Sequence, residues 1–286
     1  MIWRFSGQEM TFEKIRIMGI LNLTPDSFSD GGEFLSRQKA VERALQMEKE
    51  GADLIDLGGE STRPGARSIS EKDEIERVLP VIYEIRSRTS IPISIDTTKP
   101  KVAEACLQAG ANIINDVDGL SASFEMAHVA HRFRAGLILM HRRGTPETMQ
   151  QWTQYDDLVE DVFRELDEAF DHVCEAGVER EQVVLDPGIG FSKTAEQNLE
   201  ILARLDYFQG WNRPVLIGPS RKSFIGNLTH KDPADRDWGT AASVALSVKN
   251  GVQLIRVHNV SAMVDVIKVA DAIKLTQSRS EDHVRS

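Results

Sequence analysis

Short apolar segments alternate with longer amphipathic segments along almost the whole chain, and this alternation constrains the fold more than any other feature. The short segments are rich in Ile, Leu and Val, which is typical of parallel strands buried on both faces. We expect strands at residues 15–21, 54–57, 93–95, 113–114, 137–140, 183–185, 215–217 and 254–257. The segments between them have helical spacing. We expect helices at residues 36–50, 71–88, 101–108, 124–131, 155–176, 195–205, 240–250 and 260–275.

Alternating strands and helices imply an α/β fold with a parallel sheet and right-handed crossovers. Eight such units in 286 residues favour a single-domain (β/α)8 TIM barrel. An open doubly wound sheet is the alternative, but no Gly-x-Gly-x-x-Gly motif follows the first strand. We expect an N-terminal cap segment at 1–14, the barrel at 15–276 and a flexible tail at 277–286.

The charge and the cysteine content narrow the class of protein. A formal net charge of -10 argues against nucleic acid or an anionic membrane as the main partner. No apolar run approaches the roughly 20 residues of a membrane span, and the N-terminus lacks the apolar segment of a signal peptide. Cys106 and Cys174 lack the spacing of metal ligands and are expected to be reduced core thiols. We therefore expect a cytoplasmic enzyme.

Polar residues stand at the carboxyl end of every expected strand. In a TIM barrel these ends share one rim, where active sites are built. Any one of these residues can serve only as a turn former or a helix cap, but eight polar ends together favour a site. The residues at the strand ends are Asn22, Glu60 to Arg63, Asp96, Asn115 and Asp116, Met140 and His141, Asp186, Ser220 to Lys222, and Arg256 to His258.

Acceptor groups make up one part of this rim. The two carboxylates of Asp96 and Asp186 and the amide of Asn115 suit a planar heterocycle with adjacent N–H donors, such as an aminopyrimidinone. Met140 and Phe191 can cover the faces of such a ring. The alternatives are that Asp186 only caps the following turn and that Met140 is only a core residue.

Cationic groups make up the other part. Arg256 and His258 alternate on the last strand, so their side chains point the same way, beside the N-terminus of the final helix. With Arg63 they predict an anion site, the alternative being surface salt bridges. Lys222 lies in a turn and can position a ring or counter a leaving anion, while His141 is a candidate base or a packing residue. Zinc-ligand spacing and a Gly-x-Ser-x-Gly motif are both absent from the sequence.

Longer motifs identify a family. They are GILNLTPDSFSDGG at 19–32, GADLIDLGGESTRPGA at 51–66, ISIDT at 93–97, INDV at 114–117, MH at 140–141 with Gly144, Pro146, Met149 and Gln150, DPGIGF at 186–191 with Lys193 and Asn198, SRKSF at 220–224, GTA at 239–241 and RVH at 256–258. In these motifs the chain resembles the dihydropteroate synthases, and the resemblance runs from about residue 17 to residue 273. Asn259 departs from the family, many of whose members have Asp there, which puts one hydrogen bond at the anion site in doubt.

The resemblance implies a TIM barrel that condenses 6-hydroxymethyl-7,8-dihydropterin pyrophosphate with p-aminobenzoate. The products are 7,8-dihydropteroate and pyrophosphate, in folate biosynthesis. It also implies a homodimer, a Mg²⁺ cofactor contacted by Asn22, and an enzyme that sulfonamides target.

The resemblance further implies roles for individual residues. The implied pterin-binding residues are Asp96, Asn115, Met140, Asp186, Phe191 and Lys222. The implied pyrophosphate contacts are Asn22, Thr62, Arg63, Arg256 and His258. The implied p-aminobenzoate contacts are Phe28, Arg63, Pro64, Ser220 and Lys222. The implied catalytic residues are Asp96, Lys222, Arg256 and His258.

Two other functions compete with this one. A pterin-binding methyltetrahydrofolate:corrinoid methyltransferase would share the acidic residues, but it has no need of Arg63, Lys222, Arg256 and His258 aimed at a pyrophosphate. A catalytically silent pterin-binding protein would be marked by loss of a site residue, and none of the expected residues is missing.

Overall fold

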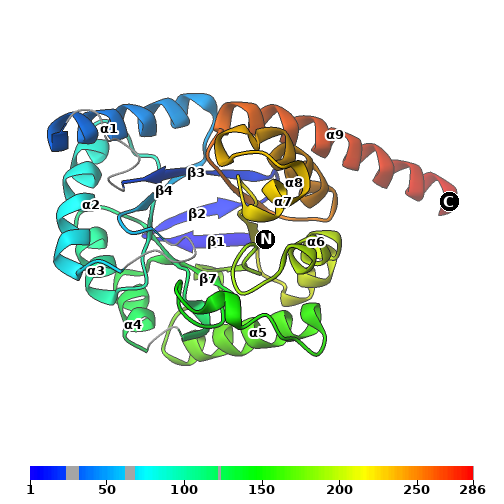
Figure 1. The fold of residues 1–286 in the computed structure, drawn as a ribbon, viewed down its shortest axis with the longest axis horizontal. Helices are drawn as coiled ribbons and strands as arrows, with labels where there is room; N and C mark the ends of the chain where they lie inside the picture. The colour runs from blue at the N-terminus through cyan, green and yellow to red at the C-terminus, as the bar shows by residue number, and fades with distance from the viewer. Residues whose placement is uncertain (24–31, 62–67, 122–123, 286) are drawn as a thin grey trace.

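The structure is a computed structural model that describes residues 1–23, 32–61, 68–121 and 124–285. Its centre is an eight-stranded parallel sheet in the order β8-β7-β6-β5-β4-β3-β10-β9 (Figure 1). The strands are β3 (Arg16–Asn22), β4 (Leu54–Gly58), β5 (Ile93–Asp96), β6 (Ile113–Asp116), β7 (Gly136–Met140), β8 (Val183–Asp186), β9 (Leu216–Ile217) and β10 (Leu254–Val257). A parallel bridge between Leu185 and Val215 joins the two ends of this sheet. The expected (β/α)8 TIM barrel is thereby confirmed.

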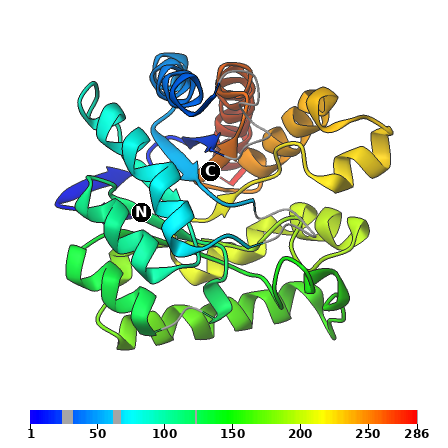
Figure 2. The same ribbon diagram turned by 60° about the vertical axis from the view of Figure 1, so that its left-hand side comes forward.

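Helices surround the barrel (Figures 1 and 2). They are α1 (Gly32–Glu50), α2 (Glu71–Arg86), α3 (Pro100–Gln108), α4 (Phe124–Phe133), α5 (Leu158–Glu175), α6 (Ala195–Ala203), α7 (Ser223–Thr229), α8 (Asp237–Lys249) and α9 (Val260–Arg285). The first and last helices, α1 and α9, are in contact and complete the ring (Figure 2). Within the described ranges, none of these helices combines the length and apolar character needed to cross a membrane.

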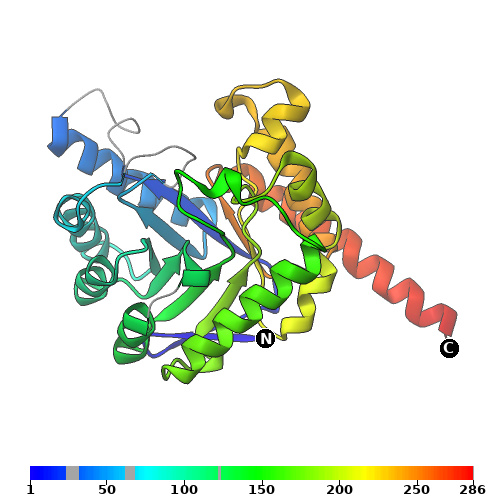
Figure 3. The same ribbon diagram turned by 60° about the horizontal axis from the view of Figure 1, so that its bottom comes forward.

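Two helices differ from the sequence prediction. α7 was not expected, because its seven residues are too few to show a helical period. The last helix was expected to end at Leu275 before a flexible tail at 277–286, but its backbone stays helical to Arg285 and projects away from the barrel (Figure 3).

The N-terminal segment forms an antiparallel hairpin of β1 (Ile2–Phe5) and β2 (Gln8–Thr11), which the sequence reading did not predict. Trp3 and Phe5 are fully or almost fully buried. They pack with apolar side chains from seven barrel strands, namely Met18, Leu54, Ile113, Ile138, Val184, Leu216 and Leu254. The indole of Trp3 also donates a hydrogen bond of 2.8 Å to the carbonyl of Gln182. The hairpin therefore covers the N-terminal end of the barrel.

The barrel interior changes character toward its carboxyl end. Side chains alternate between the two faces of a strand. In β4, Leu54 belongs to the inner cluster beside the hairpin, whereas Ile55 and Leu57 pack outward against the helices. Asp56 therefore faces inward, and its register partner on β5 is Ser94. The floor of the barrel is apolar, and the layer below its rim is polar.

Candidate active site

Two carboxylates and an arginine meet inside the barrel below the rim. Arg256, on β10, donates through Nε to Asp56 Oδ2 at 2.6 Å and through Nη2 to Asp96 Oδ2 at 2.8 Å. Asp56 is fully buried and Asp96 almost so. Burying two carboxylates around one guanidinium leaves a net negative charge in a medium that solvates charge poorly. Burial accordingly raises the pKa of Asp96 to about 7, with Arg256 opposing the rise and Asp56 adding to it.

The same aspartate orients the predicted amide. Asn115 Nδ2 donates to Asp56 Oδ2 at 3.1 Å, which leaves Asn115 Oδ1 to face other groups as an acceptor. Oδ1 of Asp96 and Oδ1 of Asp56 are buried without a hydrogen-bond partner among the described residues. Because an unpaired buried acceptor costs free energy, these oxygens suit a ligand that brings N–H donors.

The sequence reading missed Asp56. It lies in the middle of an apolar run, and a carboxylate at such a position was itself a signal, since charged residues are rarely fully buried without a partner.

The third predicted acceptor, Asp186, ends β8 and is also buried. Its Oδ1 accepts the backbone N–H of Gly188 at 2.7 Å. Burial raises its pKa to about 6, opposed by that hydrogen bond and by the charges of Lys222 and Arg256. The turn-capping role and the acceptor role are thus compatible, because one carboxylate has room for several donors.

Buried apolar side chains form a small cluster among the residues predicted to bind a pterin. Met140 and Phe191 belong to one small buried cluster, with Val117 and Met149. The Nζ atom of Lys222 lies 3.9 Å from the centre of the Phe191 ring, which is a cation–π contact. The six residues predicted to bind a pterin therefore come from β5, β6, β7, β8, the loop after β8 and the residue before α7.

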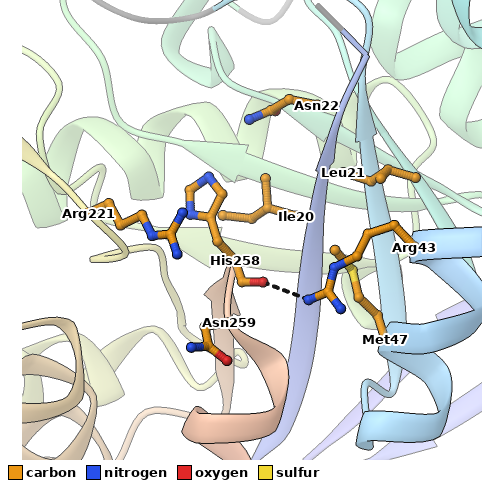
Figure 4. A pocket seen from close by; sticks show the side chains of 8 residues that line it. All are labelled: Ile20, Leu21, Asn22, Arg43, Met47, Arg221, His258 and Asn259. Atoms are coloured by element: carbon orange, nitrogen blue, oxygen red, sulfur yellow. Dashed lines mark hydrogen bonds between the residues drawn. The ribbon is translucent and has the colours of Figure 1, made fainter. Parts of the chain in front are cut away.

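A pocket of about 320 Å³ opens at the carboxyl ends of β3 and β10, beside the N-terminus of α9. Figure 4 shows Asn22, Arg43, Arg221 and His258 around it. His258 Nδ1 is hydrogen-bonded to Ser220 Oγ at 2.9 Å, so two predicted residues are in contact. The guanidinium groups of Arg43 and Arg221 next to a helix N-terminus favour an anion.

Two cations of this pocket were not singled out from the sequence. Arg43 lies on α1 and donates to the backbone carbonyl of His258 at 3.1 Å (Figure 4). Arg221 pairs with Asp237, which also accepts from Asn259 Nδ2 at 2.8 Å. In the sequence, Arg221 lies between the predicted residues Ser220 and Lys222. Nothing in the sequence distinguishes Arg43 from a surface arginine. The side chain of Asn259 makes a hydrogen bond here despite its departure from the family pattern.

Arg256 and His258 were predicted to act together on one anion, but their partners differ. The guanidinium of Arg256 bonds to carboxylates inside the barrel, whereas His258 lines the pocket beside α9. Four further predicted residues lie outside the described ranges, and their roles stay predictions: Phe28, Thr62, Arg63 and Pro64.

Comparison with known proteins shows the family to which the chain belongs. The model of the family described as "Pterin binding enzyme" matches residues 18–258. The chain is 49% identical over 258 residues to a dihydropteroate synthase of Synechocystis, covering 90% of this chain and 89% of the relative. It is 45% identical over 261 residues to that of Bacillus subtilis, covering 91% and 89%.

Solved structures give the same picture. The Yersinia pestis dihydropteroate synthase with a sulfonamide drug complex superposes with a TM-score of 0.90 at 36% identity, over 96% of this chain and 100% of that one. The Xanthomonas albilineans enzyme with 4-aminobenzoic acid superposes with a TM-score of 0.89 at 40% identity, over 96% and 98%.

Proposed function

Since the chain belongs to the dihydropteroate synthases, we propose that the acidic interior of its barrel binds the pterin and that the pocket beside α9 binds the pyrophosphate. Members of this family are transferases of folate biosynthesis. They join 6-hydroxymethyl-7,8-dihydropterin pyrophosphate to p-aminobenzoate and release pyrophosphate. The resemblance seen in the sequence is thereby confirmed.

The assignment of the pterin site rests on the buried hydrogen-bond acceptors below the rim. Asp96 Oδ1 is buried without a partner among the described residues, and Asn115 is held with its own oxygen free to accept. With Asp186 they match the row of N–H donors along one edge of an aminopyrimidinone. Phe191 and Met140 supply an apolar face, and Lys222 stands over the Phe191 ring.

The pyrophosphate assignment rests on charge and position. His258, Arg43 and Arg221 surround a pocket at the N-terminus of a long helix. Asn22 lines the same pocket and ends β3, one strand away from the Arg256 strand. We propose that Arg63, together with these cations, receives the pyrophosphate, and that Phe28, Pro64 and Ser220 border the p-aminobenzoate.

The residues present fit a Mg²⁺ ion held mainly by substrate. Among the described residues no three His, Cys, Asp or Glu side chains are clustered as metal ligands. Mg²⁺ commonly keeps its waters and takes one or two protein oxygens plus substrate phosphates, so the side-chain oxygen of Asn22 suffices. When bound, the ion supplies neutralisation of charge on the leaving pyrophosphate.

The reaction we propose is a displacement at the methylene carbon of the pterin. The bond from this carbon to the pyrophosphate oxygen breaks, the amine nitrogen of p-aminobenzoate bonds to the carbon, and the amine loses a proton. The cationic pocket stabilises the charge that develops on the leaving group. The Asp96 carboxylate, below the ring, stabilises the positive charge that develops on the pterin.

A homodimer also belongs to this proposal. Apolar side chains are exposed on two neighbouring helices: Trp238 and Leu246 on α8, and Val269, Ile273 and Leu275 on α9. These two helices pack against each other, so the exposed side chains can form one patch. Apolar patches of this kind commonly mark protein interfaces. A cytoplasmic location is proposed from the family alone.

The test is p-aminobenzoate-dependent release of pyrophosphate, measured for Asp96→Asn against Asp116→Asn. Asp116 is an equally buried carboxylate next to Asn115, and alternation along β6 turns it away from the barrel interior. We expect a fall of about 100-fold or more for Asp96→Asn and little change for Asp116→Asn. Equal activities in the two variants would refute the assignment. Tight pterin binding by the wild type without any release would favour the methyltransferase or a silent binder.

A further inference from the structure

Behind the proposed pterin pocket lies a buried lysine that the reaction above does not use. Lys193 is 3% exposed. Its Nζ donates to the carbonyl oxygens of Gly188 at 3.2 Å and Phe191 at 3.1 Å, and lies 3.0 Å from His141 Nδ1. An ammonium has three N–H groups, and each of them has a partner here.

His141 continues this chain of contacts away from the pocket. Burial and the charge of Lys193 lower the pKa of His141 to about 3, so the imidazole is neutral. Its Nδ1 therefore accepts from Lys193, and its Nε2–H donates to Glu165 Oε2 at 3.2 Å. Glu165 is paired in turn with Arg143, whose Nε lies 3.0 Å from Oε2. The result is a continuous row of polar groups from the loop after β8 to α5.

This row holds the loop after β8, which joins two proposed pterin contacts: Asp186 at the end of the strand and Phe191 in the loop. Gly188 lies between them with φ +73°, and a Cβ there would be 2.0 Å from the His141 carbonyl oxygen. The loop therefore sits directly on the end of β7. Ser192 ties its far end, because Ser192 Oγ accepts the Arg143 backbone N–H at 2.9 Å.

We infer that Lys193 is a positioning residue for pterin binding: it clamps the loop after β8 from behind and keeps a positive charge next to the Asp186 carboxylate. This inference rests on the proposed pterin site. It assigns Lys193 no contact with the substrate. The carbonyls that it holds, Gly188 and Phe191, set where the Asp186 carboxylate and the Phe191 ring stand relative to each other.

The ionisation of the groups agrees with this role. Burial raises the pKa of Asp186 to about 6, and the charges that oppose the rise are those of Lys222, Arg256 and Lys193. Burial lowers the pKa of Lys193 to about 7, opposed by Asp186 and Glu165 and reinforced by Arg143 and Lys222. Removing the Lys193 charge should therefore raise the pKa of Asp186 further.

The experiment compares Lys193→Met with a matched control, Arg213→Met. Arg213 is another buried cation bonded to backbone carbonyls, but it lies at the N-terminal end of β8 rather than at the loop after it. It donates to Val183 O at 3.1 Å and 3.0 Å and to Ile2 O at 3.2 Å. Both variants lose a buried charge, and only the charge of Lys193 lies behind the proposed pterin pocket.

Binding of 6-hydroxymethylpterin pyrophosphate is followed by pterin fluorescence as a function of pH, and the KM for p-aminobenzoate is measured separately.

For Lys193→Met we expect pterin binding to weaken about tenfold at neutral pH, as for loss of a charge-assisted contact. The acid limb of binding should move to higher pH, and the KM for p-aminobenzoate should stay the same. Arg213→Met should lower only the thermal midpoint. If the wild type fails to bind the pterin, the proposed function is wrong. If the wild type binds it and Lys193→Met matches Arg213→Met in affinity and pH profile, the positioning role is wrong.

Should Lys193→Met not fold, Glu165→Gln tests the same role from the accessible end of the row. The Glu165 carboxylate favours the charged form of Lys193. Its loss should lower the pKa of Lys193, so pterin binding should decline at a less alkaline pH than in the wild type. An unchanged alkaline limb in Glu165→Gln would overturn the inference.

Discussion

Replacing Asp56 by asparagine tests the electrostatic design of the barrel interior. Asp56 accepts from Arg256 at 2.6 Å and from Asn115 at 3.1 Å, and it is fully buried. The substitution keeps the shape of the side chain and removes one negative charge. Two consequences follow, one for stability and one for the ionisation of Asp96.

The stability change follows from the arginine that remains. Removing one partner of a buried ion pair lowers the free energy of unfolding by about 3–5 kcal/mol when the other charge is left without a partner. Here Asp96 remains 2.8 Å from Arg256, so we expect a smaller loss of about 2 kcal/mol, in line with hydrogen bonds to charged groups. For a chain of this length that corresponds to a thermal midpoint lower by roughly 5 °C.

The ionisation change has a definite sign. The negative charge of Asp56 helps to hold the pKa of Asp96 near 7, and Arg256 lowers it. Asp56→Asn removes the repulsion between the two carboxylates. Arg256 then has Asp96 as its remaining carboxylate partner, so the pKa of Asp96 should fall. If the Asp96 carboxylate must be ionised for turnover, the acid limb of kcat/KM for the pterin substrate should move to lower pH.

The assay is the pH profile of p-aminobenzoate-dependent pyrophosphate release, with Asp116→Asn as control. Burial also raises the pKa of Asp116 to about 7, but its nearby charges are Asp118 and Arg142 rather than Arg256. An acid limb that stays in place or moves to higher pH in Asp56→Asn would show that Asp56 does not raise the pKa of Asp96.

Four further predictions concern single features of the site. Lys222→Met should reduce kcat/KM for the pterin substrate about 100-fold, because it removes the cation that lies over the Phe191 ring in the proposed pterin site; a loss below threefold would contradict this role of Lys222. His258→Ala should weaken binding of the pterin pyrophosphate about tenfold and leave binding of 6-hydroxymethylpterin unchanged in calorimetric titrations; equal losses for both ligands would place the histidine at the ring instead. Gly188→Ala should lower the free energy of unfolding in urea by about 3 kcal/mol, since a side chain there has positive φ and meets the His141 carbonyl; a change under 1 kcal/mol would show that the loop can shift. Chelation of Mg²⁺ by EDTA should suppress turnover and added Mg²⁺ should restore it; unchanged turnover would show that the reaction does not need Mg²⁺.

Much of the barrel could be predicted because its strands are short apolar runs and its helices are long amphipathic ones. The rule that strand ends share one rim then placed Asp96, Asn115 and Asp186 together without any structure. Hydrogen bonds link Asn115 to Asp96 through Asp56 and Arg256, and charge links Asp186 to Lys222.

Other features needed the structure for physical reasons. In a strand buried on both faces, sequence does not say which residues point inward, so the unusual carboxylate of Asp56 could be noticed but not placed inside the barrel. Lys193 lies in a loop where its sequence neighbours are polar, and only the packing shows that its ammonium is buried. The N-terminal hairpin was missed because its strands are four residues each and one of them, β2, has a single buried side chain, that of Met10.

A single turnover, with the protein in excess over 6-hydroxymethyl-7,8-dihydropterin pyrophosphate, tests the proposed displacement itself. Both products are quantified in the same quenched samples. We expect 7,8-dihydropteroate and pyrophosphate to appear together, in equal amounts and at one rate, and only when p-aminobenzoate and Mg²⁺ are present. Pyrophosphate released at the same rate without p-aminobenzoate, or pterin bound tightly with no release at all, would contradict this displacement.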